Sequence, residues 1–183
     1  MERPTALQPQ LVMIRRPLTG LVPPRLPDPY TLRTFEHGDE RHWEQIITES
    51  FKRDAGQILF DIIMRAHSAF QPERIFFITH HRRPVATASA WHRKQDGPEI
   101  GYLHYVGCMT NHQGRGLGRA VSLAALVRMN EEGRKEAMLE TDDFRLPAIR
   151  SYLNMGFTPK IIHANQVQRW KNIRAQLPQT FLS

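Results

Sequence analysis

The feature that most constrains this chain is a glycine-rich turn inside the stretch 102–129. The stretch opens with the apolar and aromatic pattern of a strand, passes through glycines at 114, 116 and 118, and continues as an amphipathic helix. Such a turn places backbone N–H groups, with no side chain in the way, at the positively polarised start of a helix. The sequence therefore predicts a phosphate-binding turn, which the rest of the chain holds in place.

Length and composition are those of a single globular domain. The 183 residues can bury a proper core, and 40% apolar with 23% charged residues is ordinary. The one cysteine, Cys108, excludes an intramolecular disulfide and favours a reducing, cytoplasmic setting. No apolar run approaches the ~18 residues of a membrane span, and the first 20 residues lack the core of a signal peptide. We therefore expect no membrane partner.

The formal net charge of +7 can be interpreted in two ways. It fits nucleic-acid binding, or it attracts an anionic ligand and keeps the surface solvated. The basic clusters, such as Arg15-Arg16 and Arg82-Arg83, are short, and no long Lys/Arg tract or RNA-binding signature appears. The second reading is favoured, and nucleic acid is not an expected partner.

The first 29 residues carry seven of the 13 prolines. Proline removes backbone donors and fixes φ, so this segment is predicted to be an extended arm, in which Leu11–Ile14 fits a short edge strand. Tyr30–Phe35 alternates and is predicted to be the first strand of the core. Asp39 is the predicted N-cap of a helix whose apolar face holds Trp43, Ile46, Ile47, Ser50 and Phe51. A second helix is predicted over Gln57–His67, with inward-facing Ile58, Leu59, Ile62 and Ile63.

The remaining elements alternate between strands and helices. Predicted strands cover 74–80, 85–92, 99–109, 136–141 and 157–163, and predicted helices cover 117–132 and 164–177. A further short helix has Pro147 in its first turn and ends at Gly156. Residues 81–84 join the first two of these strands as a hairpin turn. The order predicts an α/β fold with a mixed, mostly antiparallel central sheet flanked by helices.

Two common phosphate-binding motifs fail on the glycine turn. The P-loop pattern requires Lys followed by Ser or Thr, whereas Gly118 is followed by Arg119 and Ala120. The dinucleotide fingerprint requires G-x-G-x-x-G after a parallel strand, whereas the glycines here stand at every second position after a predicted hairpin.

The segment Gln113–Gly118 resembles the Q/R-x-x-G-x-G/A coenzyme A loop of the GCN5-related N-acetyltransferase (GNAT) superfamily. A second motif agrees: Ala148, Tyr152 and Gly156-Phe157 have the spacing of that family's late helix. The resemblance covers about residues 30–163, and within the superfamily Leu103–Met155 looks most like the mycothiol synthase branch. The resemblance implies a GNAT domain over 30–163. The proline content predicts an arm over 1–29, and the apolar spacing predicts a helical tail over 164–183 in place of the family's usual last strand.

The resemblance also implies where acetyl-CoA binds. Its diphosphate would be held by backbone amides from Gly114 through Arg119, with Gln113 setting the turn and Arg115 and Arg119 adding charge. The residues implied for this loop are Gln113, Gly114, Arg115, Gly116, Leu117, Gly118 and Arg119. The pantetheine arm would pair like an extra strand with Val106, Gly107 and Cys108, at a bulge that splays this strand from Leu139–Thr141. The family's late-motif Asn is Arg145 here, which departs from the pattern.

Acetyl transfer to an amine needs a base for the ammonium and a donor for the departing thiolate. Tyr152 matches the family's tyrosine acid. Glu140 and His104 are both candidate bases, and relay through water without a dedicated base stays open. The predicted activity is direct attack by a primary amine on the thioester in a ternary complex. The alternative is an acyl-CoA-binding sensor or scaffold without turnover.

Other chemistries are less well supported. Cys108 is expected to pack as a small thiol instead of carrying an acetyl group. The nine histidines lack helical i,i+4 pairs and one cysteine cannot build a zinc knuckle, so no metal is predicted. Asp142 and Asp143 either recognise a cationic acceptor or cap the late helix. The acceptor, a small-molecule amine or a protein N-terminus, is not named by any motif. The loops 51–56 and 94–98 and the tail would shape its site, and a homodimer stays open.

Overall fold

The computed structural model describes residues 8–177, and these form two compact units. One unit comprises residues 15–138, and the other comprises the described residues up to 14 and from 139 onward. Strand β6 (Glu136–Thr141) begins in the first unit and ends in the second. The division into residues 1–29, 30–163 and 164–183 stays a prediction, and parts of its first and last segments lie outside the described residues.

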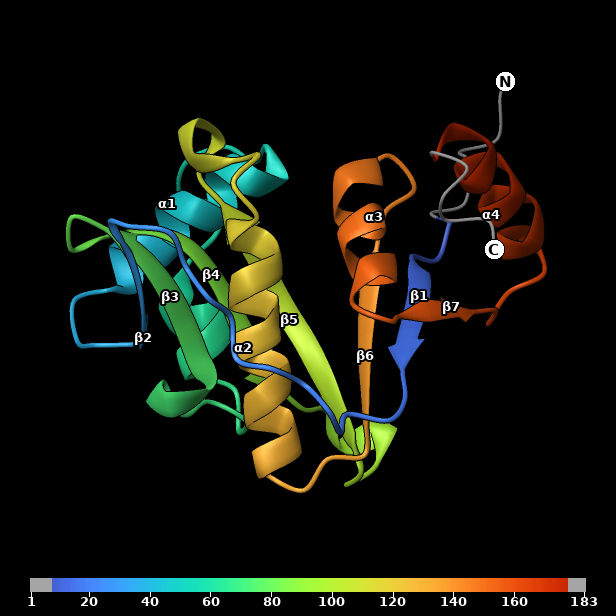
Figure 1. Cartoon of the computed structure of the whole chain (residues 1–183), viewed down its shortest axis with the longest axis horizontal. Helices are drawn as coiled ribbons and strands as arrows, with labels where there is room; N and C mark the ends of the chain where they lie inside the picture. The colour runs from blue at the N-terminus through green and yellow to red at the C-terminus, as the bar shows by residue number, and fades with distance from the viewer. Residues whose placement is uncertain (1–7, 178–183) are drawn as a thin grey trace. The chain divides into compact units, whose positions relative to one another are not determined.

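The architecture is α/β, as predicted. The other strands are β1 (Leu11–Arg15), β2 (Tyr30–Thr34), β3 (Ile75–His80), β4 (Arg83–Trp91), β5 (Ile100–Cys108) and β7 (Thr158–Lys160). The α-helices are α1 (Glu40–Phe51), α2 (Leu117–Glu131), α3 (Leu146–Asn154) and α4 (Asn165–Gln176). The strand order is β2-β3-β4-β5-β6-β1-β7 (Figure 1), with β5 and β6 parallel and the pairs β2–β3, β3–β4, β4–β5 and β1–β7 antiparallel. The mixed sheet and the C-terminal helix confirm the predicted fold class.

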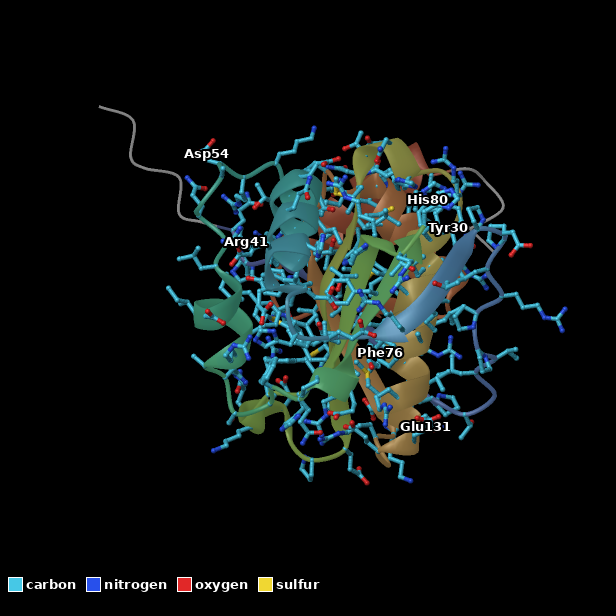
Figure 2. All side chains as sticks on the ribbon, turned by 90° about the vertical axis from the view of Figure 1, so that its left-hand side faces the viewer. Tyr30, Arg41, Asp54, Phe76, His80 and Glu131 are labelled. Atoms are coloured by element: carbon cyan, nitrogen blue, oxygen red, sulfur yellow. The ribbon has the colours of Figure 1, made fainter. Side chains whose placement is uncertain are left out.

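Helices α1 and α2 cover opposite faces of the strands β3–β5 (Figures 1 and 2). α1 buries Trp43, Ile46 and Ile47, as its spacing predicts. Asp39 stands at its N-cap but makes no capping hydrogen bond, because Arg33 binds both oxygens of the Asp39 carboxylate, at 2.5 and 2.9 Å. The predicted capping role of the Asp39 side chain is therefore replaced by an ion pair.

The segment after α1 differs from its prediction. The predicted helix over Gln57–His67 is a π-helical turn confined to Asp61–Arg65. Phe60 and Met64 are fully buried, whereas Ile62 is 70% exposed and Leu59 is 42% exposed. The predicted inward face is wrong because the segment packs through the aromatic pair Phe35 and Phe60, stacked at 5.1 Å, which apolar periodicity alone does not reveal.

Strands β3 and β4 form the predicted hairpin. Its two turn residues, His81 and Arg82, have φ of 48° and 68°, so the connection is a two-residue turn of the primed kind, formed here without glycine. Figure 2 shows Tyr30 and His80 together at the end of the sheet opposite Glu131, the last residue of α2. This is the end at which α2 begins.

In the second unit, β1 is not the edge strand that the sequence suggests. It lies between β6 and β7 in the strand order and pairs with β7 through Val12 and Lys160. Leu11, Val12 and Met13 are all buried, and consecutive buried residues are typical of an interior strand covered on both faces. α3 and α4 form where predicted, and α4 buries Trp170 and Ile173 while Val167 is 49% exposed.

Candidate functional site

The predicted phosphate-binding turn lies between β5 and α2. A 3₁₀ turn, Thr110–His112, follows β5, and the chain reaches α2 through Gly114 and Gly116, whose φ values of 77° and 74° favour glycine. The first helical hydrogen bond runs from the Ala120 N–H to the Gly116 carbonyl, at 2.9 Å. The turn is therefore shaped by left-handed backbone at these two glycines.

The backbone amides of this turn are unused. Within residues 8–177, no backbone or side-chain acceptor takes a hydrogen bond from the N–H groups of Gly114 through Arg119. Residues 114–116 and 119 are exposed, and a side chain at Gly118 would meet no atom within 4 Å. Six successive amide donors, the last three at the start of a fifteen-residue helix, are an arrangement that can bind an anion.

Side chains of the turn bind its own carbonyls. The Gln113 amide donates to the Cys108 carbonyl at 3.1 Å, and the Arg115 guanidinium donates to the Asn111 carbonyl at 2.7 Å. These contacts hold the turn against the end of β5 and the 3₁₀ turn that follows it. They leave the backbone amides of the glycine-rich turn unused. The role of Gln113 in coenzyme A binding stays a prediction.

The strand edge at Val106, Gly107 and Cys108 is partly occupied by a side chain of α1. The Ser50 hydroxyl of α1 accepts from the Cys108 N–H at 2.8 Å and lies 3.2 Å from the Cys108 carbonyl. The Met109 N–H donates to Val85 of β4, so the Cys108 backbone groups point away from β4. Backbone pairing of a ligand at Cys108 would therefore require it to displace Ser50. Pairing of a ligand with Val106 stays a prediction.

Gly107 has a packing role. A Cβ there would lie 2.9 Å from both Ile47 Cδ1 and Ser50 Oγ, closer than side-chain atoms approach. The glycine therefore lets α1 lie directly on β5, which places Ser50 against Cys108. The sequence pattern places Ser50 only on the apolar face of its helix and predicts no hydrogen bond for it. A polar residue on such a face is the signal that could have identified it.

His104 is packed among aromatic rings on β5. Its ring centroid lies 5.5 Å from Trp91, 5.2 Å from Tyr102 and 4.3 Å from Tyr105. Burial, with smaller effects from the charges of His67 and Arg93, lowers the pKa of His104 to about 3. The ring is neutral at pH 7, but such a low pKa makes it a weak proton acceptor, which weighs against His104 as the base.

The Cys108 thiol is protonated at neutral pH. Burial raises the pKa of Cys108 to about 11, against an opposing effect of Arg115. Thiolate, not thiol, is the nucleophilic form, so this environment fits the packing role expected from the sequence.

Tyr152 and Glu140 belong to the second unit. Tyr152 on α3 is 8% exposed and packs edge-on against Phe157, with ring centroids 5.9 Å apart. Burial raises the pKa of Tyr152 to about 12, against an opposing effect of Arg145, so the phenol keeps its proton at neutral pH. In the described chain no side chain or backbone group forms a hydrogen bond with its hydroxyl. Glu140 is half-buried on β6.

The two aspartates after β6 are both engaged. Asp142 accepts from Arg145 at 3.1 Å and from Gln10 at 3.0 Å, and Asp143 pairs with Arg169 of α4. The α3 N-terminus has no side-chain cap. Neither reading of the sequence, acceptor recognition or helix capping, describes these contacts. They instead fasten the segment after β6 to Gln10, which stands just before β1, and to α4.

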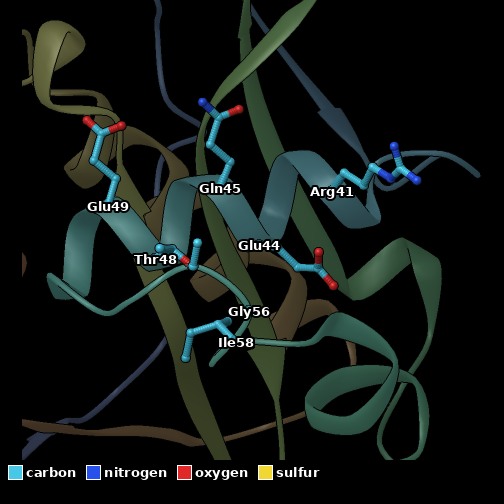
Figure 3. Close-up of a pocket in the computed structure, with 8 residues that line it drawn as sticks. Arg41, Glu44, Gln45, Thr48, Glu49, Gly56 and Ile58 are labelled. Atoms are coloured by element: carbon cyan, nitrogen blue, oxygen red, sulfur yellow. The ribbon is translucent and has the colours of Figure 1, made fainter.

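A surface hollow of about 500 Å³ lies along α1 (Figure 3). Its lining residues on α1 are Arg41, Glu44, Gln45, Thr48 and Glu49, and those on the following segment are Ala55, Gly56 and Ile58. Glu49 accepts from the Thr110 N–H at 2.5 Å, so the hollow borders the segment that leads into the phosphate-binding turn. The hollow includes part of the loop 51–56 that the sequence assigns to the acceptor.

The described residues contain no group of three or more His, Cys, Asp or Glu side chains placed to hold a metal ion. Among the helices within residues 8–177, none is both long and apolar enough to cross a membrane.

Residues 34–157 match the model of the Acetyltransferase (GNAT) family. The match covers more than half of the chain, so the chain belongs to the GNAT acetyltransferase family, which confirms the predicted resemblance. Among its relatives are mycothiol acetyltransferases. That of Thermobispora bispora is 34% identical over 155 residues, which cover 79% of this chain and 52% of that protein. That of Thermomonospora curvata is 33% identical over 155 residues, which cover 81% of this chain and 51% of that protein.

The chain thus spans about half the length of these curated relatives. Solved structures support the fold. A GCN5-related N-acetyltransferase from Kribbella flavida has a TM-score of 0.58 at 23% identity, covering 84% of this chain and 55% of that chain. The ribosomal-protein-S18-alanine N-acetyltransferase from Escherichia coli has a TM-score of 0.56 at 21% identity, covering 72% of this chain and 79% of that chain.

Proposed function

We propose that the protein is an acetyl-CoA-dependent N-acetyltransferase that moves the acetyl group to a primary amine by direct attack in a ternary complex. The observation that carries this proposal is the run of six unused amides from Gly114 to Arg119. A diphosphate needs several donors in a concave backbone, and this turn supplies them without rearrangement. Family membership and the mycothiol acetyltransferase relatives support acetyl transfer as the reaction.

In this proposal the two proton transfers are handled by different residues. The amine attacks the thioester carbonyl as a neutral nucleophile, and the C–S bond breaks with the electron pair on sulfur. Tyr152 donates its proton to that sulfur. A phenol without a hydrogen-bond partner of its own, whose pKa burial raises to about 12, is a neutral donor at pH 7.

Glu140 is the proposed base, acting on the ammonium through water. His104 is the weaker candidate because its pKa falls to about 3. We expect Glu140→Gln, which keeps the shape of the side chain but removes its basicity, to lower turnover by about 10²-fold at neutral pH. The measurement is the initial rate at saturating acetyl-CoA, compared with His104→Gln. An unchanged Glu140→Gln rate would exclude the carboxylate.

Binding of acetyl-CoA is the first test of the proposal. At a ligand concentration ~100-fold above Kd, one-site binding adds about 2.7 kcal/mol to the free energy of unfolding, and we expect a corresponding rise in melting temperature. A matched pair of variants at Gly118 locates the site. Gly118→Ala meets no neighbouring atom and keeps the rise, whereas Gly118→Glu places a carboxylate against the diphosphate and abolishes it. A Gly118→Glu protein that keeps the full rise would place acetyl-CoA elsewhere.

The alternative is a domain that binds acyl-CoA as a sensor or scaffold without turnover. The exposed amides of the turn are common to both functions, so binding does not separate them. Product formation does: a panel of small amines and a peptide with a free N-terminus, assayed with acetyl-CoA, gives acetylated product only in the first case. Binding without product from any amine would favour the sensor.

A further inference from the structure

A cluster of histidine and arginine side chains lies at the end of the sheet where α2 begins. His80 ends β3, and the β3–β4 turn supplies His81 and Arg82. The 3₁₀ turn after β5 supplies His112, and β2 supplies Tyr30. Ring centroids are 4.3 Å apart for His80 and His81, 5.0 Å for His80 and His112, and 5.0 Å for Tyr30 and His80. We call these five residues the histidine cluster (Figure 2 labels Tyr30 and His80).

A hydrogen bond fixes the orientation of His112. The Tyr30 hydroxyl lies 2.9 Å from His112 Nδ1. When the hydroxyl donates to Nδ1, the ring proton is on Nε2, and when the ring is protonated Nε2 also carries a proton. In both forms Nε2–H is a donor that Tyr30 does not use. The remaining rings, His80 and the exposed His81, have no acidic partner among the described residues.

The positive charge around this cluster is largely uncompensated. No acidic side chain in the described chain forms an ion pair with Arg82 or Arg115. Burial first, and then His80 and Arg115, lowers the pKa of His112, while Glu49 opposes this. The Glu49 carboxylate already accepts from the Thr110 N–H at 2.5 Å. The guanidinium charges of Arg82 and Arg115, beside imidazole N–H donors, favour a bound anion and disfavour a metal cation.

The cluster adjoins the proposed diphosphate site along the chain. His112 stands two residues before Gly114, where the unused amides begin, and Arg115 lies within the turn and acts on His112. Coenzyme A carries a separate phosphate on the 3′ position of its ribose, next to the diphosphate. From this arrangement we infer that the histidine cluster, with Arg115, binds the 3′-phosphate of coenzyme A. The inference rests on the proposed function, because it assigns a second part of the same ligand.

The chemistry of the cluster suits a phosphate monoester. Imidazole and guanidinium N–H groups form charge-assisted hydrogen bonds with phosphate oxygens, and a phosphate dianion can accept from several of them at once. The exposed turn residues can approach the ligand from solvent, while the hydrogen bond from Tyr30 holds His112 in place. The 3′-phosphate thus becomes the feature by which the protein distinguishes coenzyme A from its dephosphorylated form.

The test compares acetyl-CoA with acetyl-3′-dephospho-CoA by calorimetric titration. For the unaltered chain we expect tighter binding of acetyl-CoA by about tenfold to a hundredfold, the range of hydrogen bonds to a charged group. His112→Ala and Arg82→Gly should each remove most of this preference by weakening acetyl-CoA alone. Glycine suits the φ of 68° at Arg82, so the second variant keeps the turn. His37→Ala, at an exposed histidine before α1, is the matched control and keeps the preference.

The readouts separate the two proposals. Equal affinity of the unaltered chain for the two ligands overturns the 3′-phosphate site while leaving acetyl-CoA binding intact. Variants that weaken both ligands equally also overturn it, since that result reports a general effect on the turn. Absence of binding for either ligand instead removes the proposed function, and with it this inference.

Discussion

Replacement of Tyr152 by Phe is expected to lower the turnover of an amine by about 10²- to 10⁴-fold, the usual contribution of a positioned general acid. The change removes one hydroxyl, which has no hydrogen-bond partner among residues 8–177, and leaves the ring packed against Phe157. Folding stability should therefore change little. Because the lost interaction belongs to proton transfer, the melting shift produced by acetyl-CoA should persist. The rate at saturating acetyl-CoA and amine is the measurement.

Tyr105→Phe is the matched control. Tyr105 is also a partly buried phenol whose pKa burial raises, and its ring packs against Trp43 and Phe51 of α1. We expect this variant to keep its rate. The pKa of about 12 for Tyr152 adds a second expectation: deprotonation of this phenol should cause no loss of rate between pH 7 and pH 10. An undiminished rate in Tyr152→Phe would end the tyrosine-acid hypothesis while leaving acetyl-CoA binding in place.

The sequence predicts the shape of the glycine-rich turn well because its determinants are local. Gly114 and Gly116 adopt the left-handed backbone that glycine favours, and Gln113 binds a carbonyl only five residues away. The helix that follows begins at Leu117 and its C-terminal turn includes Gly133, with φ of 82°, as its pattern predicts. At this turn the conformational preference and its hydrogen-bond partner lie in one short stretch, so the sequence reveals the shape of the turn.

Contacts between distant segments are what the sequence could not predict. Ser50 meets Cys108 across 58 residues, and Tyr30 meets His112 across 82. β1 pairs with β7 through residues almost 150 positions apart, so its interior place in the strand order could not be deduced from a proline-rich arm. The prediction for the segment after α1 was wrong for a related reason. Aromatic packing with Phe35, and not helical spacing, decides which of its side chains are buried. Burial also changed the chemistry of the site by making His104 a weak base.

The ion pair at the start of α1 is expected to dominate the stability of that helix. Asp39 is 4% exposed and accepts from both terminal nitrogens of Arg33 and from the Glu36 N–H at 2.8 Å. We expect Arg33→Ala to lower the free energy of unfolding by about 3 kcal/mol, the low end for breaking a buried pair, since the Arg33 side chain is 26% exposed. Arg33→Lys keeps the charge but loses the bidentate contact. Its free energy of unfolding should lie between those of the unaltered chain and Arg33→Ala. Chemical denaturation at pH 7 gives both values.

The sign of the pH dependence provides an independent check. Burial raises the pKa of Asp39, but the hydrogen bonds from Arg33 and Glu36 outweigh it and leave the pKa below its usual value. A lowered folded-state pKa contributes stability above the unfolded value of about 3.9, and this contribution is lost as the pH falls through the folded pKa. In Arg33→Ala, burial prevails and raises the Asp39 pKa. Protonation of Asp39 in acid then removes its unfavourable buried charge, so the difference in free energy of unfolding from the unaltered chain narrows below about pH 4.

Arg33→Ala combined with Asp39→Asn separates the pair from the rest of the contact. If the loss in Arg33→Ala comes from an uncompensated buried carboxylate, neutralising that carboxylate should make the double variant less unstable than the sum of the two single changes. The contrary result is strict additivity, together with a stability difference that stays constant from pH 7 to pH 3. It would show that Arg33 stabilises α1 by packing on the Phe77 ring, whose centroid lies 5.7 Å from the guanidinium carbon, and not through Asp39.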